Sequence, residues 1–255
     1  MEFNTRKLEF TVPSGHKYSI REQNGEDEDI LSNPVDAKNL MNLTKFIVAI
    51  VVDTDFTKSG KLTVKDALDM PMLDRYCILL QSRIFSLGSE LVIPYQWPDS
   101  KVPIEYEEDL NNYLLESYTD VPSEEELDSK PYAVPMYPNA TNLKDLTFPI
   151  GEGKNISFDC FTASGEQYLL GLSEDKRTRN AELIARNLRL EVNGKYEKVT
   201  NFSMFSVREM AAIRKLVASY DPVFQGVTEL TNPNTGETLM YPVMASPNFF
   251  FLTEA

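Results

Sequence analysis

Prolines between residues 89 and 172 set the strongest limit on what this chain can fold into. Proline lacks the backbone N–H that a helix interior needs, so closely spaced prolines exclude long helices. This stretch holds eight of them, at positions 94, 98, 103, 122, 131, 135, 138 and 149. We therefore predict an extended, β-rich middle region with strands over 90–95, 102–106, 143–150 and 156–161.

The residues before this stretch have a different pattern. Residues 7–20 alternate between polar and apolar on either side of a Pro-Ser-Gly turn, which predicts a β-hairpin. Apolar residues then recur at helical spacing over 34–53, 63–68 and 73–85, and Gly88 can end the last helix with a left-handed cap. We expect residues 1–88 to form a hairpin followed by a helical unit.

The C-terminal part combines both kinds of pattern. Residues 175–187 and 206–220 have helical periodicity, and Ser206 and Glu209 have the spacing of a capping box. Strands are expected over 188–192, 226–230 and 239–244. The predicted fold class is α+β, divided into 1–88, an acidic proline-rich β region over 89–172, and an α+β part over 173–255.

Acidic residues are concentrated in one segment. The net charge is −14, and residues 99–130 hold eleven acidic residues against two lysines. Such a segment is either an exposed solvated stretch or a surface that docks a basic partner. The same charge repels nucleic acid and anionic membranes, so neither is an expected partner.

No membrane or export segment is apparent in the sequence. The first ten residues lack an apolar core of signal-peptide length, and the apolar run over 46–52 is far shorter than the ~20 residues of a spanning helix. Cys77 and Cys160 both have apolar or aromatic neighbours, which is typical of buried free thiols in a reducing compartment.

The chain has little of the usual catalytic equipment. His16 is the only histidine and follows the hairpin turn directly, where a surface residue is the ordinary interpretation. One histidine and two scattered cysteines do not supply a zinc site of the usual ligand types. We expect no enzyme, no metal and no cofactor. A hydrolase that uses carboxylates is a third reading, for which no residue can be singled out.

One local pattern matches a calcium-binding loop. Residues 55–66 have oxygen-bearing side chains at loop positions one, three, five, nine and twelve, and a glycine at position six. Only two of these side chains are carboxylates, and three lysines lie among them. We therefore favour a loop between two helices whose Ser59 or Thr63 caps the second helix. The alternative is a calcium-responsive binding module that uses Asp55, Thr57, Ser59, Thr63 and Asp66.

Two aromatic features permit two interpretations. Phe249, Phe250 and Phe251 lie close to the end of the sequence, and the only tryptophan is Trp97. The phenylalanines predict either a last strand locked into the core or a tail that inserts into a neighbouring protein, because aromatic side chains commonly anchor interfaces.

The order of the motifs resembles the baseplate hub and tail assembly proteins of T-even-type bacteriophages. Residues 11–18 (TVPSGHKY) resemble that family's leading LPSGGxxY hairpin. Residues 62–76 (LTVKDALDMPMLDRY) and 79–88 (LLQSRIFSLG) are similar to its segment with an aspartate before a helix that ends in LRxxSxG. Three later segments follow in the family's order, namely 102–110 (VPIEYEEDL), 157–165 (SFDCFTASG) and 244–251 (MASPNFFF).

The chain differs from that family at two places. Many members have paired cysteines of the zinc-knuckle kind there, whereas this sequence has WPDS at 97–100 and TNPNTG at 231–236. Without thiolates no metal is expected. The second stretch has residues suited to a tight turn, so turn chemistry can close this hairpin instead.

The resemblance implies a non-enzymatic protein that binds other phage tail or hub proteins. It would be either a structural baseplate component or a hub assembly chaperone, present in the bacterial host cytoplasm during assembly and, in the structural role, in the virion tail. We expect the helical unit 34–88 to offer an apolar docking face. The sequence leaves the oligomeric state open. The candidate interface residues are Trp97, Asp109, Glu124, Glu125, Glu126, Phe249, Phe250 and Phe251.

Overall fold

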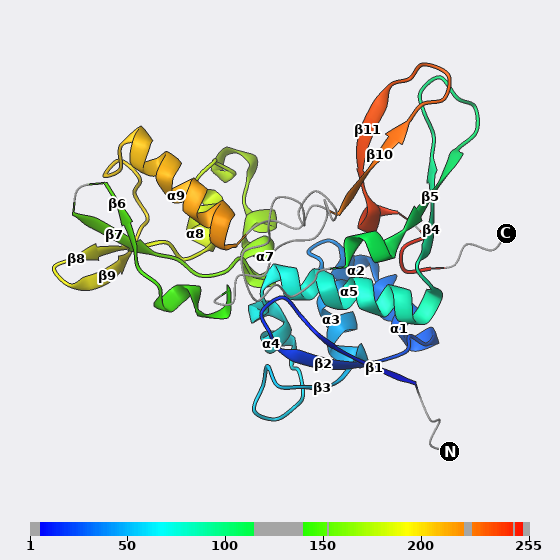
Figure 1. Ribbon diagram of the computed structural model, residues 1–255, viewed down its shortest axis with the longest axis horizontal. Helices are drawn as coiled ribbons and strands as arrows, with labels where there is room; N and C mark the ends of the chain where they lie inside the picture. The colour runs from blue at the N-terminus through cyan, green and yellow to red at the C-terminus, as the bar shows by residue number, and fades with distance from the viewer. Residues whose placement is uncertain (1–5, 115–139, 152, 222–225, 247, 252–255) are drawn as a thin grey trace.

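The chain has the predicted α+β fold class and forms two lobes (Figure 1). The computed structural model describes residues 6–114, 140–151, 153–221, 226–246 and 248–251. Lobe A consists of residues 6–114 and 226–251, and lobe B of residues 140–221. Lobe B is therefore an insertion between two segments of lobe A.

Lobe A begins with a three-stranded antiparallel sheet in the order β1 (Lys7–Thr11), β2 (Lys17–Arg21), β3 (Val51–Thr54). The predicted hairpin over 7–20 is confirmed, and Gly15 at its turn has a φ of 88°, a conformation that favours glycine. The apolar face of the sheet packs on the helices through Val12, Tyr18 and Ile20.

Helices α3 (Met41–Ile50) and α5 (Met72–Leu87) form the centre of lobe A. Thr63 and Asp66 form a capping box at α4 (Val64–Asp69), as the loop interpretation predicts, and Gly88 ends α5 with a φ of 87°. The remaining helices of this part are α1 (Gly25–Leu31) and α2 (Pro34–Ala37). Most apolar residues of α3 and α5 are buried in the cores of lobe A, so these two helices offer little of the apolar docking face expected from 34–88, whose docking role stays a prediction.

Two hairpins project side by side from lobe A, at the upper right of Figure 1. One consists of β4 (Glu90–Tyr95) and β5 (Ile104–Asp109), and η1 (Leu110–Tyr113) follows it. The other consists of β10 (Val227–Thr231) and β11 (Thr238–Pro242), and η4 (Val243–Ala245) follows it. Their facing sides share one hydrophobic core with residues of α5 and with Phe249.

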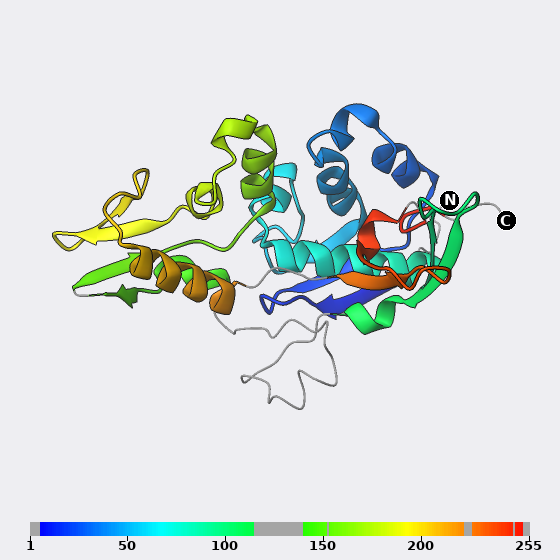
Figure 2. The same ribbon diagram turned by 90° about the horizontal axis from the view of Figure 1, so that it is seen from above.

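Lobe B contains a four-stranded antiparallel sheet with helix α9 (Val207–Tyr220) alongside it (Figure 2). The sheet has the order β6 (Phe148–Ile150), β7 (Lys154–Ser157), β8 (Arg189–Val192), β9 (Lys195–Lys198). Helix α9 packs on it, and the predicted capping box of Ser206 and Glu209 is confirmed. The other elements are η2 (Ala140–Asp145), α7 (Ala163–Gly171), η3 (Glu174–Lys176) and α8 (Ala181–Ala185).

The predicted domain boundaries at 88/89 and 172/173 differ from this arrangement. The region 89–172 is not a unit, because β4 and β5 belong to lobe A whereas β6 and β7 pair within the sheet of lobe B. The part 173–255 is likewise divided, since β10 and β11 pack on β4 and β5. Both predicted boundaries differ from the structure because segments that are distant in the sequence pack together.

Four local predictions were also wrong. The helix expected over 34–53 ends at Ile50, because Val51 and the residues after it pair with β2 as a strand. Residues 143–147 lie before β6 and include a 3-10 turn rather than strand. The helix expected over 175–187 is reduced to α8, because Arg177 donates to the backbone oxygens of Leu170 and Leu172 and holds a turn there. The strand expected over 156–161 ends at Ser157.

Candidate functional site

The loop over 55–66 does not have the arrangement of a calcium site. A calcium loop of this type lies between two helices, whereas this loop follows strand β3. Asp55 accepts hydrogen bonds from His16 Nδ1 at 3.0 Å and from the Lys17 backbone N at 2.9 Å. The first potential ligand thus faces the β1–β2 turn.

The other potential calcium ligands are also held within the protein. Asp66 accepts from the Thr63 hydroxyl at 2.6 Å in the capping box, and the hydroxyls of Thr57 and Ser59 both donate to the Lys61 backbone oxygen. In the described ranges, no three His, Cys, Asp or Glu side chains gather as a metal site. The loop therefore serves as a connector that starts α4.

Ser14 and His16 contact two different carboxylates. The backbone N and the hydroxyl of Ser14 donate to Asp74 at 2.9 and 2.6 Å, whereas His16 pairs with Asp55. Asp74 lies in the first turn of the long helix α5 and has 0% exposure. These bonds fasten the first hairpin onto α5 and give the Ser14 hydroxyl no contact with an activating histidine.

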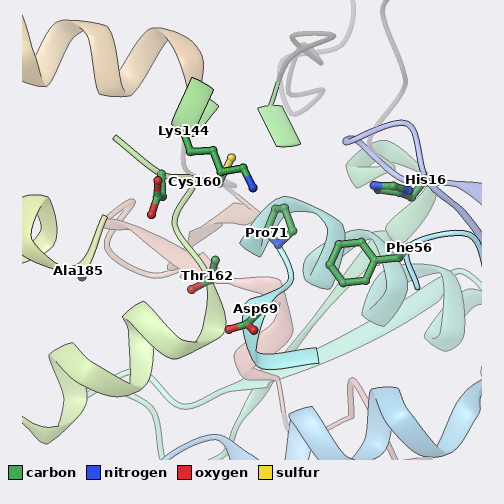
Figure 3. A pocket seen from close by; sticks show the side chains of 9 residues that line it. His16, Phe56, Asp69, Pro71, Lys144, Cys160, Thr162 and Ala185 are labelled. Atoms are coloured by element: carbon green, nitrogen blue, oxygen red, sulfur yellow. The ribbon is translucent and has the colours of Figure 1, made fainter. Parts of the chain in front are cut away.

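A cavity of about 540 Å³ opens between the lobes (Figure 3). Asp159 in its lining is paired with Arg189 at 2.6 Å, and burial and the Asp221 carboxylate raise the pKa of the Cys160 thiol. A thiol with a raised pKa stays protonated and is a poor nucleophile. Lobe A lines the cavity with His16, Phe56, Asp69 and Pro71, and lobe B with Lys144, Asp159, Cys160, Thr162 and Ala185.

The tips of the two projecting hairpins are joined by side chains. Asp99 accepts hydrogen bonds from Asn232 Nδ2 at 2.8 Å and from Asn234 Nδ2 at 3.4 Å. Trp97 Nε1 donates to the Tyr106 hydroxyl at 2.7 Å, and that hydroxyl donates to the Thr231 backbone oxygen at 2.8 Å. We call this set of contacts the tip clasp. It joins the stretches 97–100 and 231–236 of the two hairpins.

Turn chemistry closes the second hairpin, as its sequence predicts. Asn232 Oδ1 accepts from the Asn234 backbone N at 2.9 Å, and Gly236 has a φ of 73°. An asparagine that bonds two residues ahead and a glycine in the left-handed region are the usual residues of such turns.

The outward side of the β4–β5 hairpin is an acidic surface. Glu90, Val92 and Pro94 of β4 lie opposite Asp109, Glu107 and Glu105 of β5, and all four carboxylates are exposed. We call these six residues the acidic face. In the described part of the chain, no lysine, arginine or histidine forms an ion pair with any of its carboxylates.

The carboxylate on the inward side of the same hairpin forms hydrogen bonds within the protein. Glu108 lies on that side, where it accepts from the Tyr113 hydroxyl at 2.9 Å and from the Thr228 hydroxyl. On the outward side, Glu90 and Asp109 are directly opposite each other, and like charges in such a pair are unfavourable. A cation supplied from outside would relieve this repulsion.

The predicted interface residues have different positions. Asp109 is exposed in the acidic face, where it also caps η1 by accepting from the Asn111 N at 3.0 Å. Trp97 at 3% and Phe249 at 0% exposure are buried in the core, which agrees with the core interpretation for Phe249, whereas Phe250 and Phe251 are half-buried against it, and a role of these residues in binding a partner stays a prediction. Residues 124–126 lie outside the described residues.

Three residues of the acidic face were missed as individual site residues. Glu90, Glu105 and Glu107 belong to it, although 105 and 107 fall in the acidic segment 99–130. The alternation over 104–109 (IEYEED) is a period-two signal that places 105, 107 and 109 on one side of a strand. Glu90 has no such signal, because its position depends on the register with β5.

The part of the chain that the structure describes has no helix long and apolar enough to span a membrane. Comparisons of the chain with family models, with curated proteins and with solved structures find no match. The resemblance to the T-even-type baseplate family thus stays a prediction from short motifs.

Proposed function

We propose that this chain is a non-enzymatic tail baseplate hub protein, either a structural component or a hub assembly chaperone, that binds other tail proteins through the acidic face. Its partners would be phage tail or hub proteins that present a basic surface, because opposite charges steer and orient association. The proposal rests mainly on one observation, the row of exposed carboxylates around Val92 and Pro94 that form no ion pair with any cation in the described part of the chain.

The positions of the resemblance residues are consistent with a scaffold that binds. Ser14, in the leading hairpin motif, bonds Asp74, in the motif before α5. Arg83, in the motif that ends α5, donates to the backbone oxygens of Gly88 and Glu90 and fixes the start of β4. These residues hold the fold together and leave the outward side of β4 and β5 for a partner.

Co-purification tests the proposal. The tagged chain would be produced together with the neighbouring tail proteins, and the proteins retained with it identified by mass spectrometry. We expect a hub or tail protein with a basic surface to be retained. A chain that retains no tail protein would refute the proposal.

A charge-reversed pair of variants ties binding to the acidic face. The double variant Glu105→Lys, Glu107→Lys should lose the partner, whereas the control Glu174→Lys, Glu197→Lys changes the net charge equally at exposed positions of lobe B and should retain it. Equal loss in both variants would show that net charge, not this face, decides binding.

Mass spectrometry of purified virions separates the two roles. A structural component is present in intact particles, whereas an assembly chaperone is absent from them although it co-purifies with hub intermediates.

A further inference from the structure

The β4–β5 hairpin is a two-stranded sheet, so each of its strands has an outer edge whose backbone groups point away from the other strand. The Leu110 N donates to the Ser89 oxygen at 2.9 Å, so these two residues form a hydrogen-bonded pair of the ladder. Because such pairs alternate with non-bonded pairs along an antiparallel ladder, the three opposite pairs of the acidic face direct their backbone groups outward.

Side chains close the outer edge of β4. Arg83 donates to the Glu90 oxygen at 2.9 Å, and Asn248 Nδ2 donates to the Val92 oxygen at 2.9 Å. Pro94, the third outward residue of β4, has no backbone N–H to offer. Since two of its outward oxygens are bonded and one N–H is missing, β4 is poorly suited to pair with another strand.

The outer edge of β5 is open. Within the ranges that the structure describes, the outward backbone groups of Glu105 and Glu107 bond to no side chain and to no further strand, and both residues are exposed. An exposed strand edge is a template for pairing with another chain unless proline, charge or a covering segment protects it. Strand β4 has a proline and covering side chains, whereas the only such protection on β5 is the charge of its carboxylates.

The side chains of β5 determine which kind of strand fits this edge. On the outward side of the hairpin, Glu105 and Glu107 favour a cation directly opposite them and repel an acidic strand. On the inward side, Ile104 and Tyr106 are half-buried against the core that the two hairpins share, so they favour an apolar neighbour. Because side chains alternate along a strand, a segment in which Lys or Arg alternates with apolar residues matches both sides.

We propose that the open edge of β5 pairs with an extended basic segment of a tail protein, which adds an antiparallel third strand to the β4–β5 sheet. This inference rests on the proposed function and states how the acidic face holds its partner. The backbone groups of Glu105 and Glu107 provide main-chain hydrogen bonds to the added strand. The carboxylates of the same residues select a segment with Lys or Arg at every second position.

A short synthetic peptide of alternating lysine and valine serves as the probe, and calorimetry measures its binding to the full chain. At saturation we expect amide hydrogen exchange of Glu105 and Glu107 to slow by roughly tenfold or more, because their N–H groups become hydrogen-bonded. The amides of Tyr106 and Glu108, which already face β4, are the references and should change little. A peptide that fails to bind, or that binds without slowing exchange at Glu105 and Glu107, would overturn the proposal.

Two backbone-methylated peptides separate strand pairing from attraction between charges. In an antiparallel strand the lysines lie opposite Glu105 and Glu107 and direct their backbone N–H groups at β5. Methylation of the lysine backbone nitrogens should therefore weaken binding by about tenfold, whereas methylation of the valine nitrogens keeps the same charge and should weaken it little. Equal affinity of the two methylated peptides would refute the added strand and leave the charge-based docking of the proposed function in place.

Two substitutions at position 107 test the edge from the side of the protein. Glu107→Pro and Glu107→Gln both remove the carboxylate, but only proline also removes the outward N–H. We expect Glu107→Pro to bind the unmodified peptide about tenfold more weakly than Glu107→Gln does. Equal affinities of the two variants would contradict the open edge. The methylated peptides are tested on the wild-type chain, so they decide the question even when Glu107→Pro does not fold.

Discussion

The buried arginines of the two lobes have different kinds of hydrogen-bond partner. In lobe A, Arg75 donates to the Thr44 hydroxyl and the Leu40 oxygen, and Arg83 donates to two backbone oxygens. In lobe B, Arg186 is bound by the carboxylates of Asp221 and Glu182. The buried arginines of lobe A thus donate hydrogen bonds to neutral oxygens, mostly of the backbone. The buried arginine of lobe B forms ion pairs with carboxylates.

The two lobes also differ in their balance of charged residues. Residues 6–114 hold eighteen acidic and twelve basic residues, whereas residues 143–221 hold eleven acidic and twelve basic ones. The excess of acidic residues thus lies in the first segment of lobe A, which also contains the acidic face to which we assign binding.

The largest expected effect of a substitution is in lobe B. Asp221→Ala leaves the buried Arg186 without its main partner, which should lower the free energy of unfolding by about 3–5 kcal/mol. Glu182→Ala removes the half-exposed partner of the same arginine and should have a much smaller effect. Chemical denaturation of both variants measures the difference, and equal losses would contradict this view of lobe B.

Arg83→Met should lower the free energy of unfolding less than Asp221→Ala does. It removes hydrogen-bond donors to two carbonyl oxygens, whereas Asp221→Ala removes the countercharge of a buried arginine. We expect a loss of about 1–3 kcal/mol in denaturation experiments. A loss as large as that of Asp221→Ala would show that the two lobes use their buried arginines alike.

Asn232→Ala tests the tip clasp. The side chain is 1% exposed and bonds both Asp99 and the Asn234 backbone, so its removal should destabilise lobe A by about 1–2 kcal/mol. Asn234→Ala, which loses only the 3.4 Å contact to Asp99, is the matched control and should change stability little. Thermal unfolding followed by the fluorescence of Trp97 reports on this region directly.

The smallest effect concerns Glu209, which caps α9 and pairs with Lys154 at 2.9 Å. These contacts lower its pKa to about 2, below that of an unfolded chain, so its charge stabilises lobe B at neutral pH and this contribution is lost as the pH falls toward 2. Glu209→Gln should therefore lower Tm at pH 7 and not at about pH 2. A Tm difference that is the same at both pH values would mean that the charge is not the cause.

Local signals in the sequence predicted much of the fold. The capping residues Thr63 and Ser206, the turn at Gly15 and the helix end at Gly88 all act on neighbouring residues, and each was confirmed. The strand at Val51 was missed because its pairing with β2 overrides a helical pattern. Helix α7 was missed as well, since its nine residues include two glycines.

Long-range contacts could not be predicted in this way. The tip clasp joins residues 99 and 232, and the Ser14 bonds reach Asp74 across sixty positions. The acidic face was predicted only in part, because strand alternation indicates residues 105–109 and the register adds Glu90.

The dependence of partner affinity on charge tests the central claim most directly. The tail protein recovered by co-purification would be titrated against the wild-type chain and the Glu105→Lys, Glu107→Lys variant at increasing salt concentration. We predict that the variant binds at least about tenfold more weakly at low salt and that the difference shrinks as salt screens the charges. A variant that binds as tightly as the wild-type chain at low salt would contradict the claim that the acidic face is the docking surface.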